Sequence, residues 1–242
     1  MRADSEEWYA RTEMALGRQA VDRLNSSSVL VVGLGGVGGF AAEMVCRAGV
    51  GRMTIVDGDV VNITNRNRQI VALRSTGGIA KADAMGNRLL DINASLNLTI
   101  IDEFIRDERM IEILETGYDY VVDAIDTLSP KVFLIKHTLS LGMPLVSSMG
   151  AGGRIDPLQV KISDISESYN CTLARIVRKR LHRLGVRSGF KVVWSPEEID
   201  KSKVVEVEGE QNRASAVGTV PYMPAAFGIA CASVVIRDLA LL

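Results

Sequence analysis

The stretch from Ser28 to Asp59 constrains the fold more than any other part of the chain. It begins with the apolar, β-branched run from Val29 to Val32, continues through a glycine cluster and an alanine-rich segment, and ends in a second apolar run before Asp57. This order predicts a strand, a tight turn, a helix and a second strand, the form of a nucleotide-binding βαβ unit. The glycines of the predicted turn are Gly33, Gly35, Gly36, Gly38 and Gly39.

The glycine turn and the aspartates after the second strand suit a phosphate and a ribose. Glycine lets the backbone reach positive φ and approach a phosphate closely, while free N–H groups at a helix start attract anions. Asp57, with Asp59 nearby, can accept hydrogen bonds from a ribose. The spacing of Gly33, Gly35 and Gly38 also fits the dinucleotide pattern, so an NAD enzyme and an ATP enzyme both remain open at this point. The Asp-Gly-Asp pair favours ATP, and glycines that serve packing alone are the purely structural alternative.

Composition bounds the number of domains and the compartment. A chain of 242 residues with 47% hydrophobic content can bury one sizeable core, which favours a single domain. The three cysteines lie far apart without a Cys-x-x-Cys pair, so neither a disulfide framework nor a four-thiolate zinc site is expected, and the cytoplasm is the predicted location. The charged N-terminus does not read as a signal peptide. The apolar run 225–236 is too short to span a bilayer and predicts a buried terminal helix.

Alternating apolar runs and helical patterns predict an α/β fold of Rossmann-like type. The sheet is expected to be mostly parallel, with helices on both faces, and to be extended by antiparallel strands in the C-terminal part. Ligands of such sheets lie at the carboxyl ends of the strands, where Gly35, Asp57 and Asp126 would converge. The predicted strands are 29–32, 53–56, 98–101, 120–125, 144–148 and 158–162, and the predicted helices are 5–24, 79–93, 107–114 and one that begins at Ser129-Pro130.

The polar loop after Asp59 helps to separate the two nucleotide interpretations. A reaction at the α-phosphate of ATP needs fixed cations because negative charge builds up there, whereas a dehydrogenase only holds its pyrophosphate. Asn65, Arg68, Gln69 and Lys81 follow the glycine unit in order, and Asp126 at a strand tip could hold Mg²⁺ among the phosphates. Each residue alone would be a surface charge or a helix cap. The complete set favours ATP.

A basic segment in the second half indicates an anionic polymer. Between Thr172 and Lys191 every charged residue is basic, whereas a merely solvated helix face usually mixes signs. Contacts of this kind would position RNA through its phosphates, while an exposed loop base would need a pocket. The basic residues are Arg175, Arg178, Lys179, Arg180, Arg183, Arg187 and Lys191.

These motifs together carry a family resemblance. They are Gly33-x-Gly35-Gly36-Val37-Gly38, Asp57-Gly58-Asp59, Thr64-Asn65-x-x-Arg68-Gln69, Lys81 and Asp123-Ala124-Ile125-Asp126. The succession resembles the ubiquitin-activating-enzyme superfamily, which includes the ThiF, MoeB and HesA proteins. The resemblance implies adenylation of a carboxylate with ATP and Mg²⁺ by a homodimer in which an N-terminal arginine reaches the neighbour's phosphates. Arg11 matches that arginine best.

Five further stretches narrow the resemblance. They are 11–13, 65–69, Ala151-Gly152-Gly153-Arg154-Ile155-Asp156-Pro157, 173–178 and Val192-Val193-Trp194-Ser195. They resemble the TcdA group, the tRNA threonylcarbamoyladenosine dehydratases. The implied substrate is the threonylcarbamoyl carboxylate on the adenosine beside the anticodon, which is adenylated and then cyclised. An intramolecular nucleophile needs little more than a held geometry for that ring closure.

The resemblance also assigns roles. It implies one adenylating domain over 1–242, with a nucleotide-binding part at about 26–150 and an RNA- or partner-binding part at about 151–242. The implied partners are the tRNA anticodon stem-loop, a second copy of the chain and, as a further candidate, a cysteine desulfurase or sulfur-acceptor system. The implied catalytic residues are Arg11, Asn65, Arg68, Lys81 and Asp126, with Asp126 as metal ligand. The implied nucleotide contacts are Gly33, Gly35, Gly36, Gly38, Asp57, Asp59 and Gln69. The RNA contacts, which the basic segment itself predicts, are Arg175, Arg178, Lys179, Arg180, Arg183 and Arg187.

Three alternatives stay open from the sequence. Adenylation of a sulfur-carrier protein is disfavoured because carrier activators usually bear paired Cys-x-x-Cys zinc ligands, which this chain lacks. An NAD-dependent oxidoreductase and a non-catalytic RNA-binding scaffold are the others. Roles for Cys171 and Cys231, and a monovalent ion at the turn near Ala151, also stay open, although buried packing is the usual role of a free cysteine.

Overall fold

A seven-stranded sheet forms the centre of the molecule. The computed structural model describes residues 8–199, 204–206 and 215–241. The strands of the sheet are β1 (Ser28–Val32), β2 (Arg52–Val56), β3 (Asn97–Ile101), β4 (Tyr120–Asp123), β5 (Leu145–Ser148), β6 (Lys161–Asp164) and β7 (Lys191–Trp194). Their order is β3-β2-β1-β4-β5-β7-β6, parallel throughout except for the antiparallel pairing of β6 with β7. The predicted Rossmann-like α/β class, with antiparallel extension at the C-terminal end, is confirmed.

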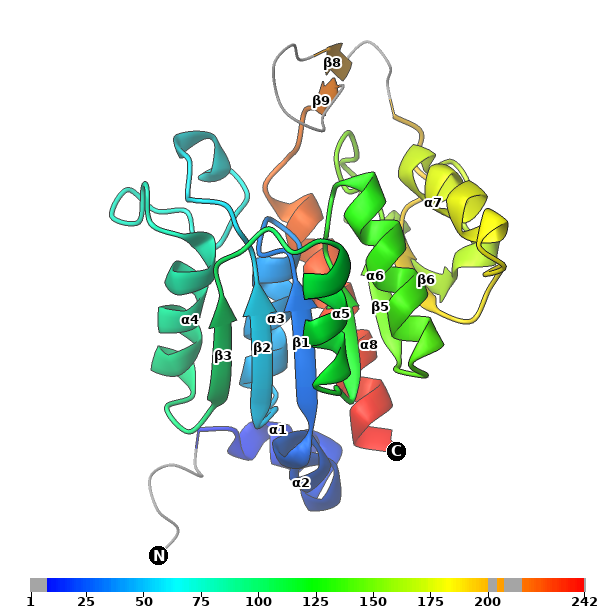
Figure 1. Ribbon diagram of the computed structural model, residues 1–242. Coiled ribbons are helices and arrows are strands. Elements are labelled where there is room, and N and C mark those ends of the chain that lie inside the picture. Colours follow the sequence, from blue (N-terminus) through cyan, green and yellow to red (C-terminus); the bar gives the residue numbers. More distant parts are fainter. Residues whose placement is uncertain (1–7, 200–203, 207–214, 242) are drawn as a thin grey trace, which may run out of the picture.

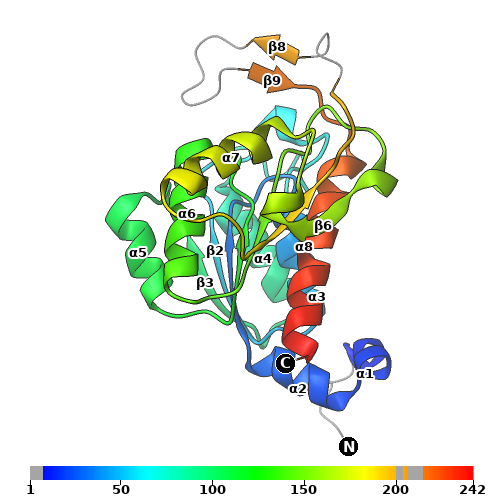
Figure 2. The same cartoon turned by 90° about the vertical axis from the view of Figure 1, so that its right-hand side faces the viewer.

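Helices cover both faces of this sheet (Figures 1 and 2). One face carries α3 (Gly38–Arg47), α4 (Lys81–Ile92) and α8 (Tyr222–Leu241), and the other carries α5 (Asp107–Glu115), α6 (Leu128–Ser140) and α7 (Thr172–Arg183). Two short helices, α1 (Ala10–Leu16) and α2 (Arg18–Ser26), lie at the amino end of the strands.

The continuous apolar runs of the central strands follow from this layering. In β1, Val29 and Val31 face the core under α3, α4 and α8, whereas Leu30 and Val32 face the core under α5, α6 and α7. A strand buried on both faces needs apolar side chains at every position rather than at every second one. The sequence run that predicted β1 is therefore a consequence of the two helix layers.

The N-terminal helical pattern is interrupted, contrary to the prediction of one helix over 5–24. Gly17 takes a φ of +86° between α1 and α2. This left-handed conformation ends α1, since glycine adopts it without the steric penalty of a Cβ. Residues 1–7 lie outside the described part of the chain.

Two strand boundaries also differ from the prediction. β4 ends at Asp123 rather than at Ile125, because the Asp123 side chain turns inward and accepts a hydrogen bond from the Ile125 N–H. The strand expected over 158–162 begins only at Lys161. Pro157, which lacks an N–H group, starts the short 3₁₀ turn η3 (Pro157–Gln159) instead, and Asp156 caps it.

The terminal helix is longer than the predicted run of 225–236. α8 extends through Asp238, whose carboxylate accepts hydrogen bonds from the Tyr120 hydroxyl at 2.8 Å and from Lys191 Nζ at 2.7 Å. By length and composition alone, α8 is the one helix of the described chain that could cross a membrane, a test that a core helix also passes. Phe227 and Cys231 are fully buried against the rest of the fold.

A short antiparallel pair, β8 (Val204–Glu206) with β9 (Ser215–Val217), lies beyond the carboxyl end of the main sheet (Figures 1 and 2). The sequence predicted a loop with a short strand over 197–210. Residues 200–203 and 207–214 of this region lie outside the described part.

The contact between α8 and α3 gives a prediction about stability. A Cβ on Gly228 would overlap the Val37 carbonyl oxygen and lie 2.8 Å from Phe40 Cβ. We expect Gly228→Ala to lower the free energy of unfolding. The overlap costs about 1–3 kcal/mol, which exceeds the gain of about 1 kcal/mol from replacing a helical glycine. Urea unfolding measures this, with Gly218→Ala, which meets no atom within 4 Å, as the control. Equal midpoints in the two variants would contradict this account of the packing.

Candidate active site

The glycine turn lies against the loop after β4 at the carboxyl edge of the sheet. Gly33 has a φ of +89°, and a Cβ there would lie 2.8 Å from the Ala124 carbonyl oxygen. α3 then begins at Gly38 without any side chain that caps its first turn. The N–H groups of an uncapped helix start remain available to an anion. The turn thus provides both close backbone approach and hydrogen-bond donors.

Asp57 connects β2 to this turn. Its Oδ2 accepts a hydrogen bond from the Leu34 N–H at 2.6 Å, and its Oδ1 accepts one from the Asp59 N–H at 2.9 Å. Burial raises the pKa of the Asp57 carboxyl, although the positive charge of Lys81 and the two N–H donors act in the opposite direction. The carboxylate predicted to meet a ribose is therefore held beside the glycine turn.

Lys81 meets Asp59 across the ends of a long loop. The bridge between Val60 and Ala80 closes the loop, and the Lys81 N–H donates to the Asp59 carbonyl at 2.8 Å. The Lys81 side chain is buried, and its Nζ lies 2.6 Å from Asp59 Oδ2. The structure thus brings together two predicted site residues that are far apart in sequence.

Within the same loop, a short turn directs Arg68 and Gln69 toward the glycines. The carbonyl of Asn65 accepts from the N–H groups of both residues, and the Asn65 side chain accepts from Asn62. A Cβ on Gly36 would lie 3.4 Å from Arg68 Cγ, and one on Gly35 would lie 3.8 Å from Gln69 Nε2. The buried Gln69 Oε1 has no hydrogen-bond partner among the described residues. This unpaired acceptor belongs to a side chain that lies beside Gly35, and it would suit a ligand that carries a hydroxyl or amino donor.

Asp126 lies on the same edge, two residues beyond the Ala124 that contacts the turn. Its side chain is exposed at the tip of the loop after β4. The described residues contain no cluster of three or more histidine, cysteine or acidic side chains that could hold a metal ion. A single carboxylate suits Mg²⁺ when substrate phosphates and water supply the other ligands.

Arg11 is the one predicted catalytic residue that lies far from the others in a single copy of the chain. It is exposed on α1, which lies at the amino end of the strands, opposite the glycine turn (Figures 1 and 2). The sequence prediction had placed Arg11 at the phosphates of the neighbouring subunit.

The basic segment forms α7 and the loop after it, near the carboxyl edge of the sheet (Figure 2). Ala174, Val177 and Leu181 are buried beneath it, whereas Leu184 is exposed. Three basic residues have structural contacts: Arg178 donates to the Ser168 carbonyl at 2.5 Å, Arg180 donates to the Ser129 hydroxyl at 2.9 Å, and Lys191 pairs with Asp238. The exposed basic side chains are those of Arg175, Lys179, Arg180, His182, Arg183 and Arg187.

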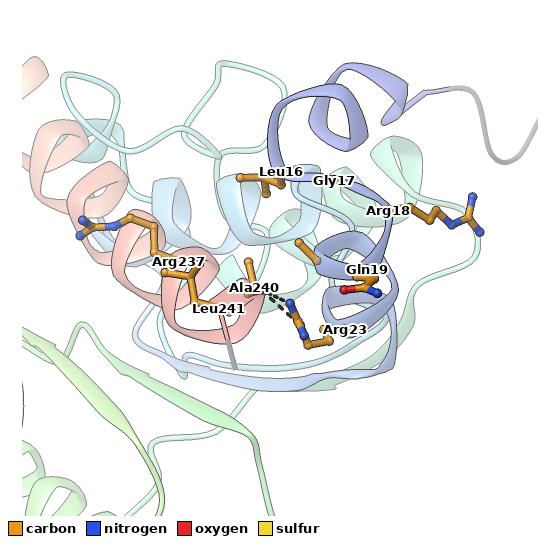
Figure 3. Close-up of a pocket in the computed structure, with 9 residues that line it drawn as sticks. Leu16, Gly17, Arg18, Gln19, Arg23, Arg237, Ala240 and Leu241 are labelled. Carbon is orange, nitrogen blue, oxygen red and sulfur yellow. Dashed lines mark hydrogen bonds between the residues drawn. The ribbon is translucent and has the colours of Figure 1, made fainter.

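Two sizeable cavities lie away from this edge. One, of about 450 Å³, lies where α1 and α2 meet the end of α8, with the Arg23 guanidinium donating to the Ala240 carbonyl (Figure 3). The other, of about 460 Å³, lies between the sheet and α5, near the starts of β1, β2 and β3. Neither is lined by the glycine turn, so the candidate site is an open edge rather than either cavity.

Comparison with known proteins identifies the family. The model of the ThiF family matches residues 9–240. The chain belongs to the ThiF family. This ThiF-family chain is 42% identical over 189 residues to the tRNA threonylcarbamoyladenosine dehydratase of Bacillus subtilis, covering 78% of the chain and 74% of that protein. It is 40% identical over 192 residues to the Escherichia coli dehydratase, covering 78% of the chain and 70% of that protein.

A solved structure agrees with these sequence relatives. The E. coli dehydratase, TcdA, in complex with ATP superimposes on this ThiF-family chain with a TM-score of 0.90 and 32% identity, covering 100% of this chain and 97% of that one. The resemblance to the TcdA group is therefore confirmed.

Sequence reasoning missed several residues of this ThiF-family site. Asp123 and Lys131 form a fully buried ion pair directly below Asp126. The exposed Phe104 ring lies against Gly58, where a Cβ would be 2.8 Å from Phe104 Cδ2. The sequence could not reveal these residues. A buried charged pair leaves no periodic pattern in the sequence, and a single phenylalanine after a strand suggests ordinary packing.

The motif around Ala151 also has a structural use. Arg154 is buried, and its Nε donates to the Ser195 carbonyl at 3.2 Å while its Nη1 donates to the carbonyl of Gly150. This arginine therefore joins the loop after β5 to the end of β7.

The cysteines of this ThiF-family chain are all buried and free. Burial raises the pKa of the Cys46 and Cys231 thiols to about 12. Since the thiolate is the reactive form, these two cysteines are poor nucleophiles at neutral pH.

The environment of Asp57 predicts its titration. The Leu34 amide signal, followed by NMR, should titrate with a midpoint above the ordinary aspartate value of 3.8, and Lys81→Met should raise this midpoint further. Because the folded-state pKa is raised, the contribution of Asp57 favours folding at low pH and is lost as the pH rises through that pKa. Asp57→Asn, as the control, should abolish the titration at Leu34. A midpoint below the ordinary value would contradict the dominant effect of burial.

Proposed function

We propose that this chain is an ATP-dependent tRNA-modifying enzyme that adenylates the carboxylate of threonylcarbamoyladenosine in tRNA and cyclises it with loss of water. The observation that carries the proposal is a continuous series of contacts from Lys81 Nζ through Asp59 and Asp57 to the Leu34 amide of the glycine turn. This series joins a buried cation to a backbone anion site. The relatives at about 40% identity are dehydratases of this kind, and the superimposed E. coli enzyme is a complex with ATP.

The residues around the turn suit ATP. Gly33, Gly35, Gly36 and Gly38 admit the phosphates, while Asp57 and Asp59 hold the ribose. The Gln69 side chain, whose Nε2 lies beside Gly35, offers an unpartnered acceptor in its Oε1. Bound ATP supplies the phosphorus that the substrate carboxylate attacks, with pyrophosphate as the leaving group.

Cations of the long loop stabilise the charge that develops in this reaction. The buried Lys81 side chain is held by its ion pair with Asp59, and Arg68 lies against Gly36. Both therefore reach the edge of the turn without a large rearrangement. Fixed charges of this kind cost little reorganisation at the moment of reaction. Asn65 orients this segment through its backbone carbonyl.

Asp126 would hold Mg²⁺. When bound, the ion would neutralise phosphate charge, and the exposed carboxylate at the loop tip is placed to contribute one ligand while the phosphates contribute others.

Cyclisation requires positioning rather than a protein nucleophile. The carbamoyl nitrogen and the activated carboxyl group belong to the same substituent, so their effective concentration is already high. The buried Cys46 and Cys231, with their raised pKa values, suit this interpretation because no thiolate is required.

The exposed face of α7 supplies the RNA contacts in this proposal. Arg175, Lys179 and Arg183 are exposed on one helix near the carboxyl edge that carries the glycine turn. Arg180 donates to Ser129 at 2.9 Å, and Arg178 supports the backbone near Ser168, so these two would contribute less to phosphate binding than the sequence alone suggested.

The working enzyme is a homodimer in this proposal. Arg11 belongs to α1, which lies at the amino end of the strands, opposite the glycine turn, so it can serve the phosphates only of another copy. Action on tRNA with ATP suits the cytoplasm. A cysteine desulfurase or sulfur-acceptor partner, and the division of the chain at about residue 150 into nucleotide-binding and RNA-binding parts, stay predictions.

The activity itself is the first test. Purified protein, given ATP, Mg²⁺ and tRNA that carries threonylcarbamoyladenosine, should release AMP and pyrophosphate, and mass spectrometry of the nucleosides should detect the loss of one water. Lys81→Ala and Asp126→Ala should each lower the rate about a hundredfold or more. Both variants should keep the wild-type circular dichroism. Lys81→Ala leaves its partner Asp59 in contact with water, and the Asp126 side chain is itself exposed, so neither variant leaves a buried unpaired charge. Near-normal turnover in both would refute these roles.

The origin of Arg11 can be tested by mixing two inactive variants. Arg11→Ala and Lys81→Ala should each be inactive alone. Mixed dimers contain one complete site, because the Arg11→Ala chain keeps its own Lys81 and receives Arg11 from its neighbour. Random pairing of equal amounts should therefore restore about a quarter of the wild-type rate. No recovery after co-expression, with mixed dimers verified by two affinity tags, would exclude an arginine supplied by the other subunit.

Charge removal on α7 should weaken tRNA binding without changing ATP binding. The triple variant Arg175→Gln/Lys179→Gln/Arg183→Gln should lower the slope of log K against log salt by about two to three, since each lost phosphate contact removes nearly one released counterion. Filter binding at several salt concentrations measures this. Arg237→Gln, at an exposed position on α8, is the control and should leave the slope unchanged. An unchanged slope in the triple variant would move the RNA site elsewhere.

A further inference from the structure

A buried ion pair lies beneath the loop that carries Asp126. Lys131 Nζ lies 2.9 Å from Asp123 Oδ2, and both side chains have an exposure of 0%. The Ser147 hydroxyl donates to the same carboxylate oxygen at 2.6 Å. Because burial removes both charges from water, an ion pair of this kind is weak evidence for stability and is often replaceable by apolar side chains. Its presence here calls for a different explanation.

The remaining hydrogen bonds of the pair converge on the peptide groups of Ile125. The Ile125 N–H donates to Asp123 Oδ1 at 3.0 Å, and the Ile125 carbonyl accepts from Lys131 Nζ at 2.8 Å. On the other side, the Ala124 N–H donates to the Val32 carbonyl at 2.9 Å. The backbone of Ala124 and Ile125, the two residues before Asp126, is therefore fixed by three contacts. They are with the Asp123 side chain at the end of β4, with Lys131 of α6 and with Val32, which directly precedes the glycine turn.

We propose that Asp123 and Lys131 are positioning residues that fix the backbone leading to Asp126. This inference rests on the function proposed above for Asp126. An acceptor and a donor are both needed beneath Ile125, because its N–H and carbonyl would otherwise be unpaired. Apolar side chains would fill the same volume but satisfy neither group. The pair thus sets where the Asp126 carboxylate stands relative to the glycine turn.

Backbone exchange without nucleotide tests this role directly. The double variant Asp123→Asn/Lys131→Met removes both charges and the donor to the Ile125 carbonyl, keeps an amide oxygen as acceptor for the Ile125 N–H, leaves no unpaired buried ion and roughly preserves volume. Amide hydrogen exchange should become about tenfold faster in peptides that cover 124–127, while β1 stays unchanged, because opening is local. Ser147→Ala is the milder variant if the double variant unfolds, and it should show the same effect more weakly. Arg88→Met, which removes an ion pair to the buried Glu43 at 2.5 Å between α4 and α3, is the control.

The Mg²⁺ dependence of ATP–pyrophosphate exchange gives a second readout. The double variant should raise the half-saturating Mg²⁺ concentration about tenfold, a shift equivalent to about 1.4 kcal/mol, with recovery of rate at high Mg²⁺. If the pair had only a structural role, the double variant would lower the fraction of active enzyme but leave the half-saturating Mg²⁺ concentration unchanged. The control Arg88→Met should likewise leave that Mg²⁺ concentration unchanged. Unchanged exchange at 124–127 in a folded double variant, or an unchanged Mg²⁺ requirement, overturns the inference. If the wild-type protein shows no ATP–pyrophosphate exchange, the proposed function fails, whereas the hydrogen exchange still decides whether the pair fixes this backbone.

Discussion

The close approach of the Gly33 backbone to the Ala124 carbonyl is the contact on which the candidate site depends. β1 and β4 are neighbours in the sheet, so the turn after one strand and the loop after the other leave at the same edge. They touch because position 33 has no side chain and adopts a left-handed φ. Any Cβ there would separate the glycine turn from the loop of Asp126. The closeness of the glycine turn to the loop of Asp126 therefore depends on the backbone at Gly33 and not on any side chain.

Around this contact, the cations are held before any ligand is present. Lys81 is buried against Asp59, and a closed loop sets the distance between the two. The carboxylate of Asp57, two residues before Asp59, accepts hydrogen bonds from two backbone N–H groups, one in the glycine turn and one in the loop after β2. A polyanionic ligand would compete with one exposed carboxylate for Lys81 rather than order a free side chain, so little conformational entropy remains to be lost.

The parts of this fold that were predictable share a local signature. Buried parallel strands appear as continuous apolar runs, and the glycine turn, the aspartate after β2 and the basic helix are contiguous motifs. Other features depend on contacts between distant segments, which the sequence does not display. The Asp123–Lys131 pair looks like two surface charges until α6 packs over β4, and α8 continues past its apolar run because Tyr120 and Lys191 engage Asp238. The break at Gly17 was missed for another reason, since a glycine in a helical pattern is common and only the tertiary path shows that it ends a helix.

The packing of α8 onto the first turn of the nucleotide unit has a consequence for synthesis of the chain. Pro224, near the start of α8, lies where a Cβ on Gly36 would be 2.9 Å away, and Gly228 packs on the start of α3. The βαβ unit is therefore completed by a helix that a ribosome makes much later. Until α8 has been made, β1 and α3 lack one wall, and Phe227 and Cys231 are missing from the core that they later fill. A nascent chain consequently completes the packing around its glycine turn only after α8 has been made, and loss of α8 would remove one wall of the βαβ unit.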